Sequence, residues 1–128
     1  MGNGDRNHEI RSYKDLVAWQ RAFALGGTVY RLTAEFPSDE RFGLTSQLRR
    51  AAISVASNIA EGYGRASRPE YLRFLRIARG SLYEVETQML FAVEFKFVAV
   101  EQFASVAEQI NDTARVLSGL IHRLEGNE

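Results

Sequence analysis

Apolar residues recur at spacings of three and four along most of the chain, which is the periodicity of buried helix faces. In residues 43–69, one such set falls on a single side of a helix at about 100° per residue. Its members are Leu44, Leu48, Ala52, Val55 and Ile59. Gly62 and Gly64 are expected to end this helix, because glycine adopts the left-handed conformation common at helix C-termini.

The same spacing predicts two further helices whose regular heptads are typical of a bundle seam. The third helix begins near Arg68, after a capping box formed by Ser67 and Glu70. Its seam is Tyr71, Leu75, Ala78, Leu82, Val85, Met89 and Ala92. The fourth helix has the seam Phe103, Val106, Ile110, Thr113, Leu117, Leu120 and Leu124. Residues 95–98 are the expected connection between them, and Gly126 is the expected stop.

The first helix is expected between a cap at Ser12 and a stop at Pro37, and it carries two apolar stripes. One stripe is Leu16, Trp19, Phe23 and Tyr30, and the other is Ala18, Ala22, Leu25, Val29, Leu32 and Phe36. Two stripes predict two buried faces. Gly26 and Gly27 would each cost about 1 kcal/mol relative to alanine, which predicts close packing against a neighbour.

Four helices with short links predict an all-α, antiparallel up-down-up-down four-helix bundle. An alternative joins the third and fourth patterns into one long hairpin that completes its bundle only in a dimer. The bundle domain is expected over residues 12–125, after a flexible N-terminal tail over 1–11. The spare stripe of the first helix and apolar residues off the third seam predict a homo-oligomer. Those off the seam are Phe74, Ile77, Phe91, Phe95 and Phe97.

Composition fits one globular domain that buries a core without disulfides. Of the 128 residues, 45% are hydrophobic and 25% are charged, and none is cysteine. Residues 1–10 lack the apolar core of a signal peptide, and no apolar run reaches the length of a membrane span. These features together predict a cytoplasmic protein.

Charge is balanced overall but segregated along the chain. Residues 41–80 hold eight arginines and two acids, whereas residues 81–128 hold eight acids and three basic residues. The guanidinium group suits bidentate contact with phosphate or carboxylate. Three roles remain open, namely contact with a nucleic-acid backbone, contact with the acidic half of another copy, and simple solvation. The candidate nucleic-acid-binding residues are Arg49, Arg50, Arg65, Arg68, Arg73, Arg76 and Arg79.

The polar side of the central helix predicts a hydrogen-bonded network with the antiparallel third helix, which would fix the register of the two. Its expected members are Ser54, Asn58, Glu61, Ser81 and Glu84. This set has no histidine or lysine that could activate a nucleophile, so a structural role is expected rather than a catalytic one.

Two other chemistries can be tested against the positions of the histidines. A di-iron bundle needs Glu-x-x-His pairs, but Gly119 precedes His122 and Asp5 precedes His8 at that spacing. No metal or other cofactor is therefore expected. Ribonucleases of the HEPN class carry arginine and histidine separated by about four to six residues, and Arg115 and His122 have six residues between them. Such a nuclease stays as an alternative.

Several short motifs resemble one protein family. They include Phe36-Pro37, Arg41-Phe42-Gly43-Leu44, Gln47-Leu48-Arg49-Arg50-Ala51-Ala52, Ser57-Asn58-Ile59-Ala60-Glu61-Gly62 and Phe74-Leu75, followed by Ala78, Ser81 and Glu84. They are similar to the four-helix bundle proteins encoded in intervening sequences of bacterial 23S ribosomal RNA genes, over nearly the whole chain from Tyr13 to Leu124. The resemblance implies a homopentamer without established catalytic residues.

More distantly, the chain resembles the barrel-shaped accessory proteins of diversity-generating retroelements, which partner a reverse transcriptase and bind nucleic acid. Those relatives are strongly basic, whereas this chain has a formal net charge of zero. We therefore expect a non-enzymatic homo-oligomeric scaffold, a pentamer, with RNA or DNA contacts through the arginine-rich flank. The alternatives are a module that binds only protein and a ribonuclease that uses Arg115 and His122.

Overall fold

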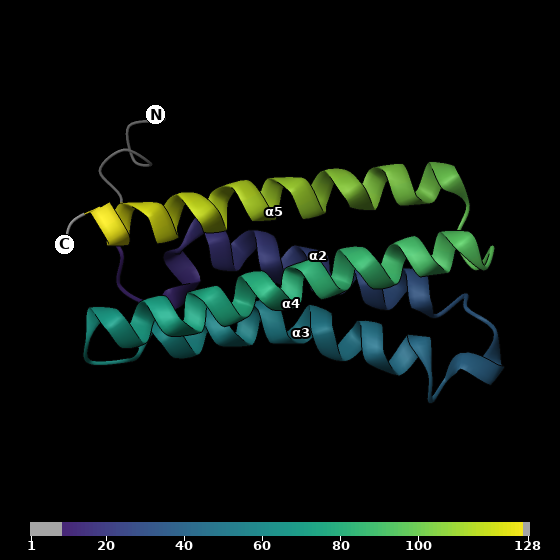
Figure 1. Cartoon of the computed structure of the whole chain (residues 1–128), viewed down its shortest axis with the longest axis horizontal. Helices are drawn as coiled ribbons and strands as arrows, with labels where there is room; N and C mark the ends of the chain where they lie inside the picture. Colours follow the sequence, from purple (N-terminus) through teal and green to yellow (C-terminus); the bar gives the residue numbers. More distant parts are fainter. Residues whose placement is uncertain (1–8, 127–128) are drawn as a thin grey trace.

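Four antiparallel helices lie side by side in the computed structural model, which describes residues 9–126 (Figure 1). They are α2 (Val17–Thr33), α3 (Leu44–Tyr63), α4 (Arg68–Glu94) and α5 (Val100–Gly126). Two short 3₁₀ turns, η1 (Tyr13–Asp15) and η2 (Ser38–Glu40), precede α2 and α3. The expected tail over 1–11 lies mostly outside the described residues.

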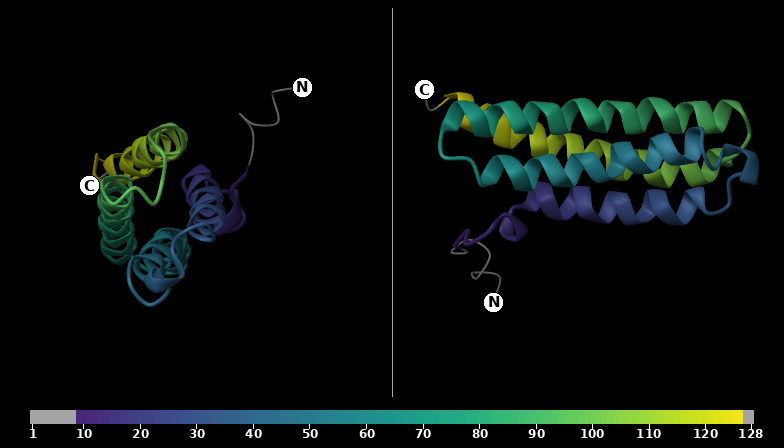
Figure 2. Two further views of the ribbon diagram at one scale, coloured as in Figure 1. Left: turned by 90° about the vertical axis from the view of Figure 1, so that its right-hand side faces the viewer. Right: turned by 90° about the horizontal axis from the view of Figure 1, so that it is seen from below.

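The four helices close a ring, because each packs on the next along the chain and α2 also packs on α5 (Figure 2). The predicted up-down-up-down bundle is thus confirmed. The hairpin alternative is wrong, since one chain completes the ring of four. Within residues 9–126, no helix combines the length and the apolarity that a membrane crossing requires.

The heptad patterns identify most of the core. The α4 seam is fully buried from Leu75 to Ala92, and in α3 the predicted core is buried except for the half-buried Leu44 at its first turn. Toward the end of α5, Ile121 is buried, whereas Leu120 is half-buried. A straight helix drifts by about 20° per heptad from a strict seven-residue repeat, and this drift moves the buried stripe by one residue.

The first helix is shorter at both ends than the sequence predicts. Ser12 and Asp15 do form a capping box, but it caps the N-terminus of η1 and not that of α2. Leu16 is extended (φ −75°, ψ 128°) before α2 begins. At the other end α2 stops at Thr33, four residues before Pro37. The chain then turns so that Phe36 packs on Phe97, with ring centroids 5.6 Å apart. The helix thus ends before the proline, where Phe36 turns into the core beside Phe97.

The connection over residues 95–98 is where the sequence predicts it, and a Schellman motif forms it. Lys96 N–H donates to Val93 O at 2.9 Å, and Phe97 N–H donates to Ala92 O at 2.8 Å. Lys96 has a φ of 66°, the left-handed conformation more usual for glycine.

The prediction of left-handed glycines at the end of α3 is wrong. Gly64 has φ −82° and ψ −1°, and none of the described glycines has a positive φ. Gly62 is instead required by packing, because a Cβ there would lie 2.8 Å from Phe74 Cβ. At the N-terminus of α4, Ser67 Oγ accepts from Glu70 N–H at 3.3 Å as expected for a capping box. The Glu70 carboxylate, the other half of the predicted box, pairs with Arg73.

Candidate interaction surfaces

The candidate arginines fall into separate groups along α3 and α4. Arg49 and Arg50 lie in the first half of α3, whereas Arg65 comes sixteen residues later, just after that helix. At about 1.5 Å per residue, this separates the two groups by about 24 Å. Arg68, Arg76 and Arg79 follow on α4. Each group therefore has its own surroundings.

Arg49 caps the C-terminal end of α2. Its Nε donates to Thr33 Oγ1 at 2.7 Å and its guanidinium to Tyr30 O at 3.3 Å, and the guanidinium stacks on the Tyr30 ring at 4.4 Å. A positive charge is stabilising where helix carbonyls lack partners. The side chain of Arg50, the next residue, is exposed and makes no hydrogen bond or ion pair with any described residue.

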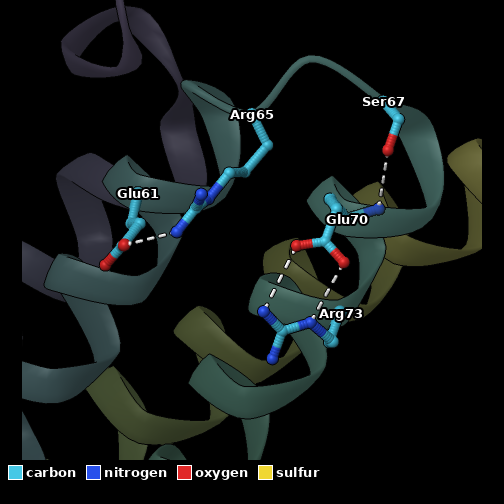
Figure 3. A network of polar contacts seen from close by, with 5 residues as sticks. All are labelled: Glu61, Arg65, Ser67, Glu70 and Arg73. Atoms are coloured by element: carbon cyan, nitrogen blue, oxygen red, sulfur yellow. Dashed lines mark hydrogen bonds and ion pairs between the residues drawn. The ribbon is translucent and has the colours of Figure 1, made fainter.

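Arg65 and Arg73 meet at the turn between α3 and α4. Arg65 pairs with Glu61 at 2.8 Å, and Arg73 makes two bonds to Glu70, of 3.3 and 3.2 Å (Figure 3). Both guanidinium groups also stack on Phe74, at 4.6 and 4.5 Å from its ring centroid. Phe74 is consequently only 8% exposed, so its prediction as a spare apolar residue is wrong.

A basic cluster forms between α4 and the end of α5. Arg76 donates to Glu125, and this bond lowers the pKa of the Glu125 carboxyl, with the charges of Arg76, Arg79 and His122 adding to the effect. Arg79 itself makes no hydrogen bond or ion pair with the residues that the structure describes. The basic and acidic segments of the sequence thus meet within one chain.

Three of the five expected members of the polar network come together between α3 and α4. Ser54 Oγ and Ser81 Oγ lie 2.8 Å apart, and Asn58 Nδ2 donates to both Ser54 O and Ser54 Oγ at 2.9 Å. Glu61 is outside this network because it pairs with Arg65, and Glu84 lines the adjacent α3/α4 groove without a bond to it. The network joins two helices and holds no charged group.

The Arg115 and His122 pair is not assembled as a site. Arg115 donates to Asp112, which also accepts from Arg21 of α2. His122 is exposed about two turns further along α5 and has no hydrogen bond to Arg115 among the described residues. Across the described residues, no group of three acidic, histidine or cysteine side chains could hold a metal ion.

An apolar groove of about 440 Å³ runs between α2 and α3. Aromatic rings form its α2 wall, where Trp19 stacks on Phe23 at 4.9 Å and meets Tyr13 edge-on at 5.3 Å. Its floor is made by small residues, among them Gly26, Gly27, Ala56 and Ala60. Ile53 and Ser57 line the α3 side. The sequence patterns did not predict this role, although Ile53, Ala56 and Ala60 have the spacing of one helix face. We call this hollow the α2/α3 groove.

A second apolar surface lies on α4, on the side that faces away from the core. Tyr83, Leu90, Phe91 and Phe95 are each about half exposed there, at 51, 51, 50 and 54%. Phe91 and Phe95 stack with their centroids 5.8 Å apart. We call the set Gly80, Tyr83, Leu90, Phe91, Glu94 and Phe95 the α4 outer face. Because α2 and α4 occupy diagonal corners of the ring, the two apolar surfaces lie on different sides of the bundle (Figure 2).

A family model described as "23S rRNA-intervening sequence protein" matches residues 14–119. A solved structure of a protein with unknown function from the S23 ribosomal protein family of Bacteroides thetaiotaomicron has a similar fold. Its TM-score is 0.77 at 20% identity, over 83% of this chain and 96% of that one. No curated protein matches the chain.

Proposed function

Because the chain belongs to the 23S rRNA-intervening sequence protein family, we propose that it acts as a non-enzymatic scaffold assembled from identical copies. The exposed apolar surface carries this proposal. Phe23 is 64% exposed in the α2/α3 groove, and four large apolar side chains are half exposed on the α4 outer face. Monomeric proteins rarely leave contiguous apolar patches of this kind in water.

The polar groups support a scaffold rather than a catalyst. Ser54, Asn58 and Ser81 bond to one another across the α3/α4 contact, and Glu61 is held by Arg65. A nucleophile needs an adjacent base to activate it, and these groups provide only mutual hydrogen bonds. The polar side chains therefore set helix register, and the apolar surfaces carry the function.

The experiment is the mass of the native particle by sedimentation equilibrium at about micromolar to 100 μM concentration. We expect a defined assembly of the 14.4 kDa chain, with five copies as the specific expectation. A monodisperse folded monomer throughout this range would reject the scaffold. A defined assembly of another size would retain the scaffold and reject the pentamer.

A second candidate function, contact with RNA or DNA, is favoured by the basic cluster of Arg76, Arg79 and His122. Around Glu125 the two arginines outnumber the one carboxylate, so the local charge is positive despite the neutral whole. Arg65 and Arg73 are less suited to phosphate, since their guanidinium groups already pair with carboxylates and stack on Phe74.

A salt titration with a generic single-stranded RNA tests this second function. We expect binding at about 50 mM salt that weakens steeply toward about 200 mM, as counterion release requires. Arg76→Ala combined with Arg79→Ala should abolish the binding, whereas Arg65→Ala, matched in charge, should leave it. If the unaltered protein does not bind RNA at low salt, the nucleic-acid function is rejected, and a module that binds only protein is the function that remains.

A further inference from the structure

We propose that the α2/α3 groove of one copy receives the α4 outer face of a second copy. This pairing rests on the proposed scaffold function and specifies how its subunits meet. It is a heterologous contact, because the two surfaces that touch are different parts of the chain.

The groove has the shape of a helix-binding site. Its floor of glycine and alanine allows a helix backbone to approach closely, and Trp19 and Phe23 rise along one side. An amphipathic helix commonly docks in a hydrophobic groove of this kind through side chains spaced three, four and seven apart. On the α4 outer face, Tyr83 and Leu90 are seven residues apart, and Phe91 and Phe95 are four apart.

Glycines on both surfaces lack an explanation within their own chain. A Cβ added at Gly26 or at Gly80 would meet no atom within 4 Å, and one at Gly27 would meet only the side chain of Arg31. Glycine in a helix interior destabilises the helix relative to alanine. Close approach by a second copy accounts for this cost at both places, where the fold of one chain does not.

Charge selects the groove and the α4 outer face as partners for each other. Toward the α2/α3 connection the groove continues into a basic hollow that shares Tyr30 and Ile53 with it and is lined by Arg41, Arg49 and Arg50. By contrast, residues 81–94 of α4 contain three glutamates and no basic residue. Groove on groove would oppose like charges, and so would face on face, whereas groove on face brings opposite charges together.

A heterologous contact has a consequence that an isologous one lacks. Each copy keeps one free groove and one free face after its first contact, so association continues until the rotation closes a ring. The groove lies on the α2/α3 side and the face lies on α4, so one copy can make both contacts of a ring at the same time. This geometry allows the pairing to be tested by mixing variants.

Phe23→Glu places a negative charge in the groove, and Leu90→Arg places a positive charge on the α4 outer face. Both side chains are more than half exposed, so each variant is expected to fold, as circular dichroism can check. Each variant alone should sediment as a 14.4 kDa monomer. An equimolar mixture should associate again, because the unaltered face of one variant meets the unaltered groove of the other.

Ser105→Glu and Ser105→Arg, exposed on α5, make the matched charge changes and should leave the assembly unaltered. If Phe23→Glu unfolds, Gly26→Leu takes its place, since the fold leaves open space at Gly26 while a leucine there fills the groove. It should block association without any change in charge.

The outcomes separate this pairing from the scaffold itself. If the unaltered protein assembles but the two variants do not pair on mixing, the heterologous contact is overturned and the scaffold remains. If either variant assembles like the unaltered protein, its surface lies outside the contact and stays free for another partner, and the pairing is again overturned. A monomeric unaltered protein would reject both.

Discussion

The neighbouring atoms decide which side chain a position in this bundle can hold. Gly62 is the sharpest case, because α4 crosses α3 so closely there that a Cβ would lie 2.8 Å from Phe74 Cβ and 3.2 Å from Tyr71 O. Gly64, two residues later, would meet only carbonyl oxygens of its own helix at 3.6 Å and beyond. The two glycines therefore serve different purposes.

Gly62→Ala is expected to destabilise the fold by about 1–3 kcal/mol, the usual cost of forcing extra atoms into a packed site. Gly64→Ala is the control, and it should be neutral or slightly stabilising because its backbone is already helical. Urea denaturation of both variants at one protein concentration measures the difference. Equal stabilities for the two would contradict the close crossing at Gly62.

The ion pair of Arg76 and Glu125 gives stability that depends on pH. The bond from Arg76 holds the pKa of Glu125 below its ordinary value of 4.5. A carboxyl with a lowered folded-state pKa stabilises the fold above its unfolded-state pKa, and this contribution disappears as the pH falls through the folded-state value.

Glu125→Gln should therefore lower the Tm near neutral pH, and the difference from the unaltered protein should vanish below the lowered pKa. Thermal unfolding followed between about pH 7 and pH 3 measures this. Glu108→Gln, on an exposed glutamate of α5 without an ion pair to the described residues, is the matched control. A Tm difference that persisted unchanged at the acid end would reject the ion pair as its source.

At the scale of elements, the ends of helices depend on side chains from neighbouring helices. The end of α2 is held by Arg49 of α3, which bonds Thr33 Oγ1 and Tyr30 O. Hydrogen bonds that involve a charged group contribute about 1.5–3 kcal/mol, and Arg49 is half-buried. Within the chain, Arg49 thus anchors the end of α2.

Arg49→Ala should speed hydrogen exchange of the amides in the last turn of α2, such as Ala34 N–H, which donates to Tyr30 O. The expected increase is about tenfold or more, from a loss of about 1.5 kcal/mol. Arg50→Ala removes the same charge one residue later without removing a hydrogen bond within the described chain. Exchange that rose equally in both variants would indicate a general charge effect instead of a cap.

At the scale of the whole molecule, the bundle completes its own core and still leaves apolar surface uncovered. The α2/α3 groove and the α4 outer face together expose Phe23, Leu90 and Phe91. If identical copies cover these surfaces, association and folding are linked, and any contact that forms only in the folded state stabilises it by mass action.

The Tm of the unaltered protein should accordingly rise with protein concentration. Raising the concentration about a hundredfold should give a shift of several degrees, which differential scanning calorimetry resolves. Phe23→Glu should show a Tm that does not depend on concentration. A concentration-independent Tm for the unaltered protein would contradict the link between folding and association.

The sequence alone determined the fold class, the four helices and nearly all of the core. It could do so because helical periodicity records which side of each helix avoids water, and a seam such as Leu75, Leu82 and Met89 needs no knowledge of its partner. The spare apolar residues Phe91 and Phe95 were visible in the same way, as departures from the seam.

Only the tertiary structure decided what each charged or small residue contacts. Arg49, Arg65 and Arg76 look alike in the sequence, yet one caps α2, one covers Phe74, and one joins α5. Likewise, the space beside Gly62 is occupied by Phe74 and Tyr71, whereas the space beside Gly26 is open. A long flexible side chain can reach partners far away in sequence, and a glycine takes its meaning from the neighbour that approaches it, so helix packing had to be known first.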